Sequence, residues 1–303
     1  YAHFCAFGHR LDHWLRRQGA RAMFDLLEVD DGDPGTLRHW VHHLRQLCGD
    51  GDLPDWEAPR YQPWRLAERR HLNPGSAGGA MFHLVLRPAQ GATPEWQAGD
   101  LVEIGPCHAD SVVDAWLACS GRNGDHIVEF ANQRVSLRAL LARSQLPDAN
   151  AVDGLTTAQL AARLQRLPHR EYSIASVPAD GAIELLVRCQ QHADGTPGLG
   201  SGWLAMHARA DALIDLRIRG NRSFHPPVDE RPLLLIGNGT GLAGLRALLR
   251  SRSARGLRGN WLVFGERSAR FAALLPEELE RWCEDGTLGR CDRVWSRDGC
   301  SIR

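Results

Sequence analysis

The chain has 303 residues with 36 basic and 36 acidic side chains, and all of the basic ones are arginine. Without lysine, it can contain neither the phosphate loop that ends in Gly-Lys-Ser/Thr nor a Schiff-base or nucleophilic lysine. A formal net charge of zero argues against a general nucleic-acid surface, which needs excess cations. The eight cysteines form no C-x-x-C pair, which favours reduced thiols, a cytoplasmic protein and no metal site.

The chain begins at Tyr1 rather than Met, so we expect it to be part of a longer protein. No apolar run approaches the roughly 20 residues of a membrane-spanning helix. Apolar residues at helical spacing predict helices around residues 11–15 and 37–44, and residues 22–29 predict a short buried strand. A stretch rich in Gly, Asp and Pro, residues 51–63, favours a linker.

The middle of the chain alternates between strand-like and helix-like patterns. Strand character marks residues 64–105, while leucines at helical spacing within 135–168 predict helices that end at Pro168. Further strands are predicted over residues 172–177, 183–189 and 214–218. An apolar strand (233–236), a glycine-rich turn, a helix (243–250) and a second strand (260–264) then form the β-turn-α-β pattern typical of a parallel nucleotide-binding sheet.

The glycine-rich turn, Gly237-Asn-Gly-Thr-Gly241, is the clearest candidate for phosphate binding. Glycine lets the backbone approach a phosphate closely, and the following helix adds free N–H groups. A tight turn that binds nothing is the alternative. A second glycine segment, residues 198–202, could also face a phosphate, and a structural loop is the alternative. The string Arg170-Glu-Tyr-Ser173 could contact a ligand, and a plain edge strand is the alternative.

Other polar side chains occupy positions at which function and simple solvation compete. Arg267 and Arg297 lie at the ends of the last two predicted strands. The ends of parallel strands line a ligand crevice, and arginines there suit a charged group such as a phosphate. Five arginines between 246 and 258 predict either a positive field or a solvated helix face. Two histidine pairs at i, i+4 spacing, 9/13 and 39/43, lack an obvious set of further metal ligands, so we interpret them as solvated or capping residues.

The order of the motifs is more informative than any one of them. R-x-Y-S, G-x-x-S-x-W-L, G-x-G-T-G-L-A, W-L-x-F-G-x-R and W-S-R-D follow one another over residues 170–298. In this order they resemble the ferredoxin–NADP reductase superfamily and, more narrowly, the diflavin reductases. The resemblance implies a mixed α+β and α/β fold: an antiparallel FAD-binding β-barrel with a helical insert, then a truncated parallel-sheet NADP-binding domain. The implied parts are a flavodoxin-like FMN-domain tail (1–50), a linker (51–63), the FAD domain (64–229, insert about 106–168) and the NADP domain (230–303).

The resemblance also implies roles for single residues. Arg170 would hold the FAD pyrophosphate, Tyr172 would lie against the flavin, and Ser173, the catalytic candidate, would hydrogen-bond near the hydride-accepting nitrogen. The FAD phosphates would meet Gly198, Leu199, Gly200 and Ser201.

For NADPH, the implied contacts with the pyrophosphate and nicotinamide side are Gly239, Thr240 and Gly241. The implied contacts with the rest of the nucleotide are Arg267, Ser296 and Arg297, of which the last two would select the 2′-phosphate. Tyr1 matches the residue that stacks on FMN.

The chain departs from the family pattern at a few positions. Asn238 and Gly244 replace two prolines of the glycine-turn segment, and the lysine expected after Ser-Arg falls near Ile302, so that Arg303 is the nearest cation. The resemblance implies that NADPH gives a hydride to FAD and that electrons pass through FMN to a haem or iron–sulfur acceptor protein or fused domain. The alternative is a flavin-binding docking module without NADPH turnover of its own. Either would be cytoplasmic, or attached to the cytoplasmic face of a membrane through segments outside this chain.

Overall fold

The computed structural model describes residues 5–24, 26–29, 37, 40, 43–44, 61–76, 78–91, 94–130, 133–192, 195–272 and 274–297. The chain divides into two compact units, Tyr1–Arg60 (unit 1) and Tyr61–Arg303 (unit 2). The division falls inside the predicted linker, and the assignment of domains stays a prediction. Tyr1, Ile302 and Arg303 lie outside the described residues.

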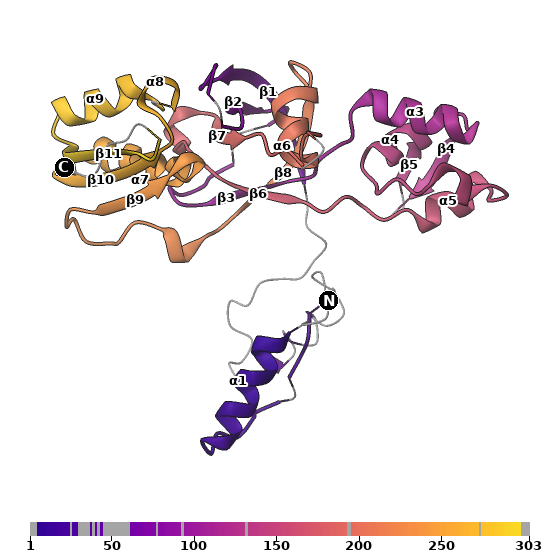
Figure 1. The fold of residues 1–303 in the computed structure, drawn as a ribbon, viewed down its shortest axis with the longest axis horizontal. Helices are drawn as coiled ribbons and strands as arrows, with labels where there is room; N and C mark the ends of the chain where they lie inside the picture. Colours follow the sequence, from indigo (N-terminus) through magenta and orange to yellow (C-terminus); the bar gives the residue numbers. More distant parts are fainter. Residues whose placement is uncertain are drawn as a thin grey trace. The chain divides into compact units, whose positions relative to one another are not determined.

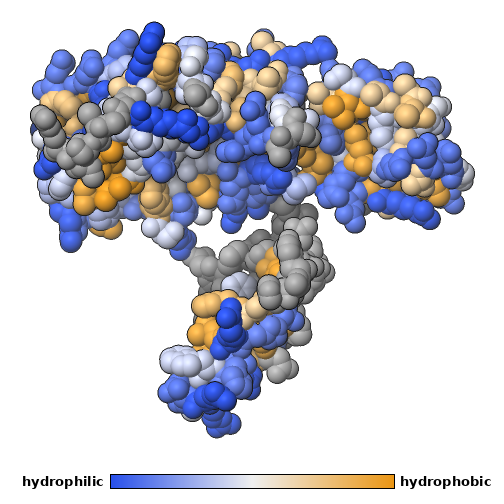
Figure 2. All heavy atoms as spheres, in the orientation of Figure 1, coloured by the Kyte–Doolittle hydropathy of each residue, from blue (hydrophilic) through white to orange (hydrophobic). Residues whose placement is uncertain are grey.

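Unit 1 contains the helix α1 (Ala6–Arg17), at the place where helical spacing predicts one. No residue of α1 is buried, and Figure 2 shows apolar residues on the surface of this unit. The strand predicted over residues 22–29 is wrong, because the described residues of this range have no strand and Leu26 is exposed. A strand needs a partner for its backbone groups, and no described strand pairs with this segment.

Unit 2 is built on a six-stranded sheet with the order β6-β3-β8-β1-β2-β7, in which all neighbours are antiparallel. Its strands are β1 (Gln62–His71), β2 (Met81–Pro88), β3 (Leu101–Ile104), β6 (Arg170–Ser173), β7 (Ile183–Arg188) and β8 (Leu213–Arg219). Short helical segments accompany the sheet: η2 (Pro178–Asp180), α6 (Leu199–Gly202), the π-helix η3 (Trp203–His207) and η4 (Arg222–Phe224). Alternate side chains such as Trp64, Leu66, Leu84 and Leu86 are buried in its core, as the two-residue period of a strand requires.

A strand is predicted over residues 172–177. The observed strand, β6, is shorter: it begins at Arg170 and ends at Ser173. Beyond it, Ile174 N still donates to Asp100 O (3.1 Å), but Ala175 N donates to Glu184 O in β7 (2.8 Å). Ile174 and Ala175 are both buried, so the chain turns here from one edge of the sheet toward the other. The predicted antiparallel sheet is confirmed, and its closure into a barrel stays a prediction.

The insert between β3 and β6 has a core of its own, formed by side chains such as Val113, Leu117, Leu140 and Leu160. Its elements are α3 (Asp110–Ser120), β4 (Ile127–Phe130), β5 (Gln133–Ser136), α4 (Leu137–Ala142), η1 (Ala149–Val152) and α5 (Thr157–Arg163). The insert thus contains the helices that the sequence predicts and, in addition, an antiparallel pair, β4 and β5, that it does not predict. In Figure 1, the six-stranded sheet lies between this insert and the last part of the chain.

The last part is a parallel sheet with the order β11-β10-β9, which confirms the predicted β-turn-α-β unit. Its elements are β9 (Leu234–Asn238), η5 (Gly239–Gly241), α7 (Leu242–Ala254), β10 (Asn260–Glu266), α8 (Ala269–Ala272), α9 (Pro276–Glu284) and β11 (Leu288–Trp295). Leu235, Leu248, Leu262, Phe264 and Trp282 pack between the sheet and its helices. Among the described helices of both units, none is long and apolar enough to cross a membrane.

Of the five arginines between 246 and 258, Arg255 and Arg258 are exposed, but those within α7 do not form a solvated face or a free positive field. Arg246 is only 4% exposed, and Arg252 only 1%. Arg246 donates to Glu278 Oε2 (2.5 Å), to Glu184 Oε2 (2.6 Å) and to Ala175 O (2.9 Å), so it joins α7 to α9 and to the six-stranded sheet. The sequence could not show this, because its carboxylate partners lie far away along the chain.

Candidate functional site

Two neighbouring cavities contain most of the residues that the motifs single out. We call the first the β6–β7 cavity; it has a volume of about 440 Å³ and lies beside β6, the end of β7 and α6. The second, the strand-end cavity, has a similar volume of about 440 Å³ and lies at the carboxyl ends of β9, β10 and β11. Arg188, Gln190 and Thr240 line both cavities, so the two share a wall.

The β6–β7 cavity brings together predicted site residues that are up to 31 positions apart, namely Arg170, Tyr172, Gly198, Leu199, Gly200 and Ser201. The glycine segment is tied to the end of β7 by two hydrogen bonds. Gly198 N donates to Gln190 O (2.7 Å), and Ser201 Oγ accepts from Gln190 N (2.9 Å). These bonds hold the first turn of α6 against β7, directly beside β6.

Tyr172 and Arg170 line the cavity beside α6. Burial raises the pKa of Tyr172 to about 12, so the phenol is protonated at neutral pH and can act as a donor. Arg170 is exposed, and its Nη1 donates to Pro168 O (3.3 Å) and His169 O (3.1 Å). The guanidinium carries further donors that can face an anion.

Gly200 is required by the close approach of these side chains. A Cβ atom at this position would lie 2.7 Å from Arg170 Cγ and 3.2 Å from Tyr172 Oη. We therefore expect Gly200→Ala to displace both side chains and to weaken FAD binding by about tenfold, an effect comparable to the loss of one good hydrogen bond to a charged group. The FAD content of the purified variant measures this. Gly220→Ala, where a Cβ meets nothing within 4 Å, is the matched control. An unchanged FAD affinity in Gly200→Ala would show that Arg170 and Tyr172 can shift without any effect on FAD binding.

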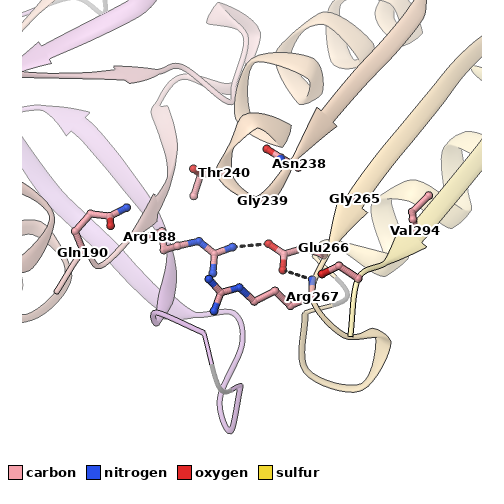
Figure 3. A pocket seen from close by; sticks show the side chains of 10 residues that line it. Arg188, Gln190, Asn238, Gly239, Thr240, Gly265, Glu266, Arg267 and Val294 are labelled. Carbon is pink, nitrogen blue, oxygen red and sulfur yellow. Dashed lines mark hydrogen bonds and ion pairs between the residues drawn. The ribbon is translucent and has the colours of Figure 1, made fainter. Parts of the chain in front are cut away.

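The strand-end cavity is formed where three parallel strands finish (Figure 3). Parallel pairing continues just past the strands, because Ser296 N donates to Glu266 O and Arg297 N to Arg267 O, both at 2.9 Å. Open parallel sheets bind ligands in such a crevice. Of the predicted residues, Gly239, Thr240, Arg267 and Ser296 line it.

The glycine turn has the backbone conformation that its sequence predicts. Gly239 has φ +52°, in the left-handed region that favours glycine, and η5 then leads directly into α7. Gly237 permits a second close approach, because a Cβ there would lie 2.8 Å from Leu245 Cδ1 of α7. The absence of a side chain at Gly237 therefore lets β9 pack closely against α7.

Among the described site residues, Ser173, Gly241 and Arg297 line neither cavity. Ser173 is half-buried at the end of β6, opposite Leu101 of β3 and next to Tyr172. Gly241 ends η5, and Arg297 is exposed beside Ser296. Their roles, like those of the lining residues, stay predictions, and the predicted FMN contact, Tyr1, lies outside the described residues.

Among the lining residues that sequence reasoning missed are Arg188, Gln190 and Glu266. Arg188 is the charged residue that follows the apolar run Leu185–Val187 of β7, and Glu266 is the second variable position in the motif W-L-x-F-G-x-R. The sequence signal that could have identified Arg188 and Glu266 as lining residues was a charged side chain at the carboxyl end of a strand. Arg188 Nη2 donates to Glu266 Oε1, and Arg267 N donates to Glu266 Oε2 (2.8 Å), as Figure 3 shows.

The site joins an antiparallel sheet with a glycine-lined cavity to a parallel sheet with a strand-end crevice, as the family resemblance leads one to expect. Known proteins agree with this resemblance. The chain is 34% identical to the sulfite reductase [NADPH] flavoprotein alpha-component of Yersinia enterocolitica and 31% identical to that of Vibrio cholerae, over 98% of the chain in each case. It is 37% identical to the Neisseria meningitidis protein of the same name over 48% of the chain. No family model matches the chain.

The chain belongs to the diflavin reductase family, as its motifs predict. The chain spans about three fifths of the length of these curated relatives. It covers 61% of the Yersinia protein and 59% of the Vibrio protein.

Proposed function

We propose that the protein is an NADPH-dependent flavoprotein oxidoreductase that uses FAD and FMN. In this function, NADPH gives a hydride to FAD, and electrons continue through FMN to a haem or iron–sulfur acceptor. The observation that carries the proposal is the shared wall of the two cavities, because hydride transfer requires a nicotinamide and a flavin in near contact. The names of the relatives, which contain both NADPH and flavoprotein, support it.

The β6–β7 cavity fits a flavin dinucleotide in its chemistry. The absence of a Cβ at Gly200 lets Arg170 and Tyr172 lie directly against the glycine segment. Arg170 supplies a guanidinium for a pyrophosphate, Tyr172 supplies a flat face, and Gly198–Ser201 supply backbone N–H groups for phosphates. When bound, FAD supplies a ring that accepts two electrons together and releases them singly.

The strand-end cavity fits a phosphorylated nucleotide. Its charged lining is Arg188, Glu266 and Arg267, and Glu266 is already paired with Arg188. The cavity therefore has a net positive charge, with Arg267 available to an anion. Ser296 lies in the wall and Arg297 follows it, which suits a 2′-phosphate.

The remaining parts of the proposal concern the longer protein. By family resemblance, Tyr1 would stack on FMN, and residues 1–50 would belong to a flavodoxin-like domain. The relatives are named as flavoprotein components of sulfite reductase, which favours a haemoprotein partner as the acceptor. A cytoplasmic location fits the unpaired cysteines.

The colour of the purified chain tests the proposed function. We expect a yellow protein, or one that turns yellow with added FAD, whose visible flavin absorbance NADPH bleaches under anaerobic conditions. Retained flavin that NADPH does not bleach would instead favour a docking module without NADPH turnover. A colourless chain that takes up no FAD would contradict both functions.

Arg297→Ala is expected to weaken NADPH binding by about tenfold and NADH binding hardly at all, because the 2′-phosphate is the only difference between the two and a charge-assisted hydrogen bond contributes on this scale. Titration of each nucleotide into the FAD-loaded chain measures the two affinities. Arg290→Ala is a suitable control, since Arg290 lies on β11, the strand that precedes Arg297, pairs with Asp292 and lines neither cavity. An equal loss for both nucleotides would remove Arg297 from this role.

A further inference from the structure

Arg188, which lines both cavities, forms a buried ion pair with Glu266 of the strand-end cavity, and this pair connects the two sheets. Arg188 ends β7 of the six-stranded sheet, and Glu266 ends β10 of the parallel sheet. The Glu266 side chain is 3% exposed and that of Arg188 18%, so the pair is largely shielded from water. Figure 3 shows it between the glycine turn and the end of β10.

Both members of the pair are held by further bonds. Glu266 Oε2 accepts from Arg267 N (2.8 Å), which fixes the carboxylate at the strand end. Arg188 Nη1 donates to Gly79 O (3.3 Å), which fixes the guanidinium against the loop before β2. With bonds on both sides, the pair has one orientation rather than several.

The glycine turn rests directly on this pair. A Cβ at Gly239 would lie 3.1 Å from Arg188 Nη2 and 3.2 Å from Glu266 Oε1. Any other residue at this position, already strained by φ +52°, would press on the bonded atoms. The position of the Gly239 backbone in the strand-end cavity therefore depends on the position of the ion pair.

We propose that Arg188 and Glu266 are positioning residues for the nucleotide: their ion pair sets the Gly239 turn for the pyrophosphate and nicotinamide half of NADPH, at the distance from the β6–β7 cavity that hydride transfer needs. This inference rests on the proposed function and adds two residues to it. The adenosine half would be held by Arg267, Ser296 and Arg297. The one side-chain bond that the described residues show from the pair to this group, Arg267 N to Glu266 Oε2, can be kept by a glutamine at 266, whose side-chain oxygen still accepts.

The test compares two ligands that share the adenosine half. NADP⁺ contains the pyrophosphate and the nicotinamide, whereas 2′,5′-ADP lacks both. In the FAD-loaded full chain, we expect Arg188→Met/Glu266→Gln to weaken NADP⁺ binding by about fivefold, the scale of one hydrogen bond, and to leave 2′,5′-ADP binding unchanged. Calorimetric titration measures both. The double variant removes the charges together, so that neither is left buried and unpaired.

The control is Arg209→Met/Asp110→Asn, which removes an exposed ion pair outside both cavities and should change neither affinity. If the Arg188/Glu266 double variant loses both ligands equally, or neither, the positioning role is overturned. If that variant does not fold, Arg188→Lys decides: it keeps the charge but not the guanidinium fork, and NADP⁺ alone should bind more weakly. Unchanged affinities in this variant would also overturn the role. If the unmodified chain binds neither ligand, the proposed function fails, and the inference fails with it.

Discussion

Ser173→Ala is expected to slow the reduction of bound FAD by NADPH by about a hundredfold, the usual cost of removing one positioned hydrogen-bond donor from a reaction centre. FAD should stay bound, because Arg170 and the segment Gly198–Ser201, not Ser173, line the β6–β7 cavity. Ser173 is half-buried and backbone-paired to Leu101, so its loss should leave β6 in place. Rapid mixing with NADPH measures the rate, and the flavin absorbance of the purified variant measures the FAD content.

The serine prediction has two informative companions. Ser173→Thr keeps a hydroxyl and should keep most of the rate. Ser223→Ala removes an exposed hydroxyl that bonds only locally, to Asn221, and should change nothing. An unchanged rate in Ser173→Ala would show that the hydroxyl is not at the hydride step, whereas loss of FAD from this variant would show a binding role instead.

Arg246→Met is expected to destabilise the protein by about 3–5 kcal/mol, the cost of breaking a buried ion pair from one side. Arg246 bonds to both Glu184 and Glu278, and all three side chains are largely shielded from water. Without Arg246, two carboxylates would lose a charged partner at the contact between the six-stranded sheet and the helices α7 and α9. Urea unfolding followed by tryptophan fluorescence measures the change.

The matched control for this prediction is Arg209→Met, which removes an arginine whose ion pair with Asp110 is exposed. Exposed ion pairs contribute about 0–1 kcal/mol, so its unfolding midpoint should hardly move. Equal unfolding curves for Arg246→Met and the unmodified chain would mean that the network around Arg246 contributes no net stability.

The same network predicts a loss of stability in acid. Burial by itself would raise the pKa of Glu184, but the hydrogen bond from His83 and the charge of Arg246 outweigh it and lower the pKa from 4.5 to about 2. Because the folded-state pKa lies below the unfolded one, the stabilisation is complete above pH 4.5 and is lost as the pH falls toward 2. It corresponds to about 3 kcal/mol. Glu184→Gln should flatten this part of the stability profile, and an equally steep profile in the variant would assign the acid loss to other groups.

Parts of the fold and of the site follow from local pattern. The apolar runs of β7, β9 and β10 predict strands, although β9 is an edge strand whose Leu234 and Ile236 are exposed rather than buried. The spacing of glycines between β9 and α7 predicts a tight turn, in which Gly239 is left-handed. Such signals lie within a few residues, where backbone sterics and side-chain periodicity act. The motif order extends this to the family, and six of the residues predicted to bind FAD line one cavity.

Local pattern fails where a residue depends on a distant partner. Residues 22–29 have a strand-like composition but, within the described part of the chain, no strand to pair with, and the antiparallel pair β4–β5 lies in an insert that the family resemblance implies to be helical. Tertiary packing decides such cases, because a strand is stable only with a neighbour that accepts its hydrogen bonds.

By itself, the sequence determined the family, the glycine turn and the chemistry available to the site: without lysine, the cations that face a phosphate must be arginines. Only the tertiary structure decided which arginines these are. Arg246 is neutralised between Glu184 and Glu278, Arg188, which lines both cavities, is paired with Glu266, and Arg267 faces the strand-end cavity. The physical reason is that a charge acts according to its burial and its nearest partners, and here those partners come from strands and helices that are distant in the chain.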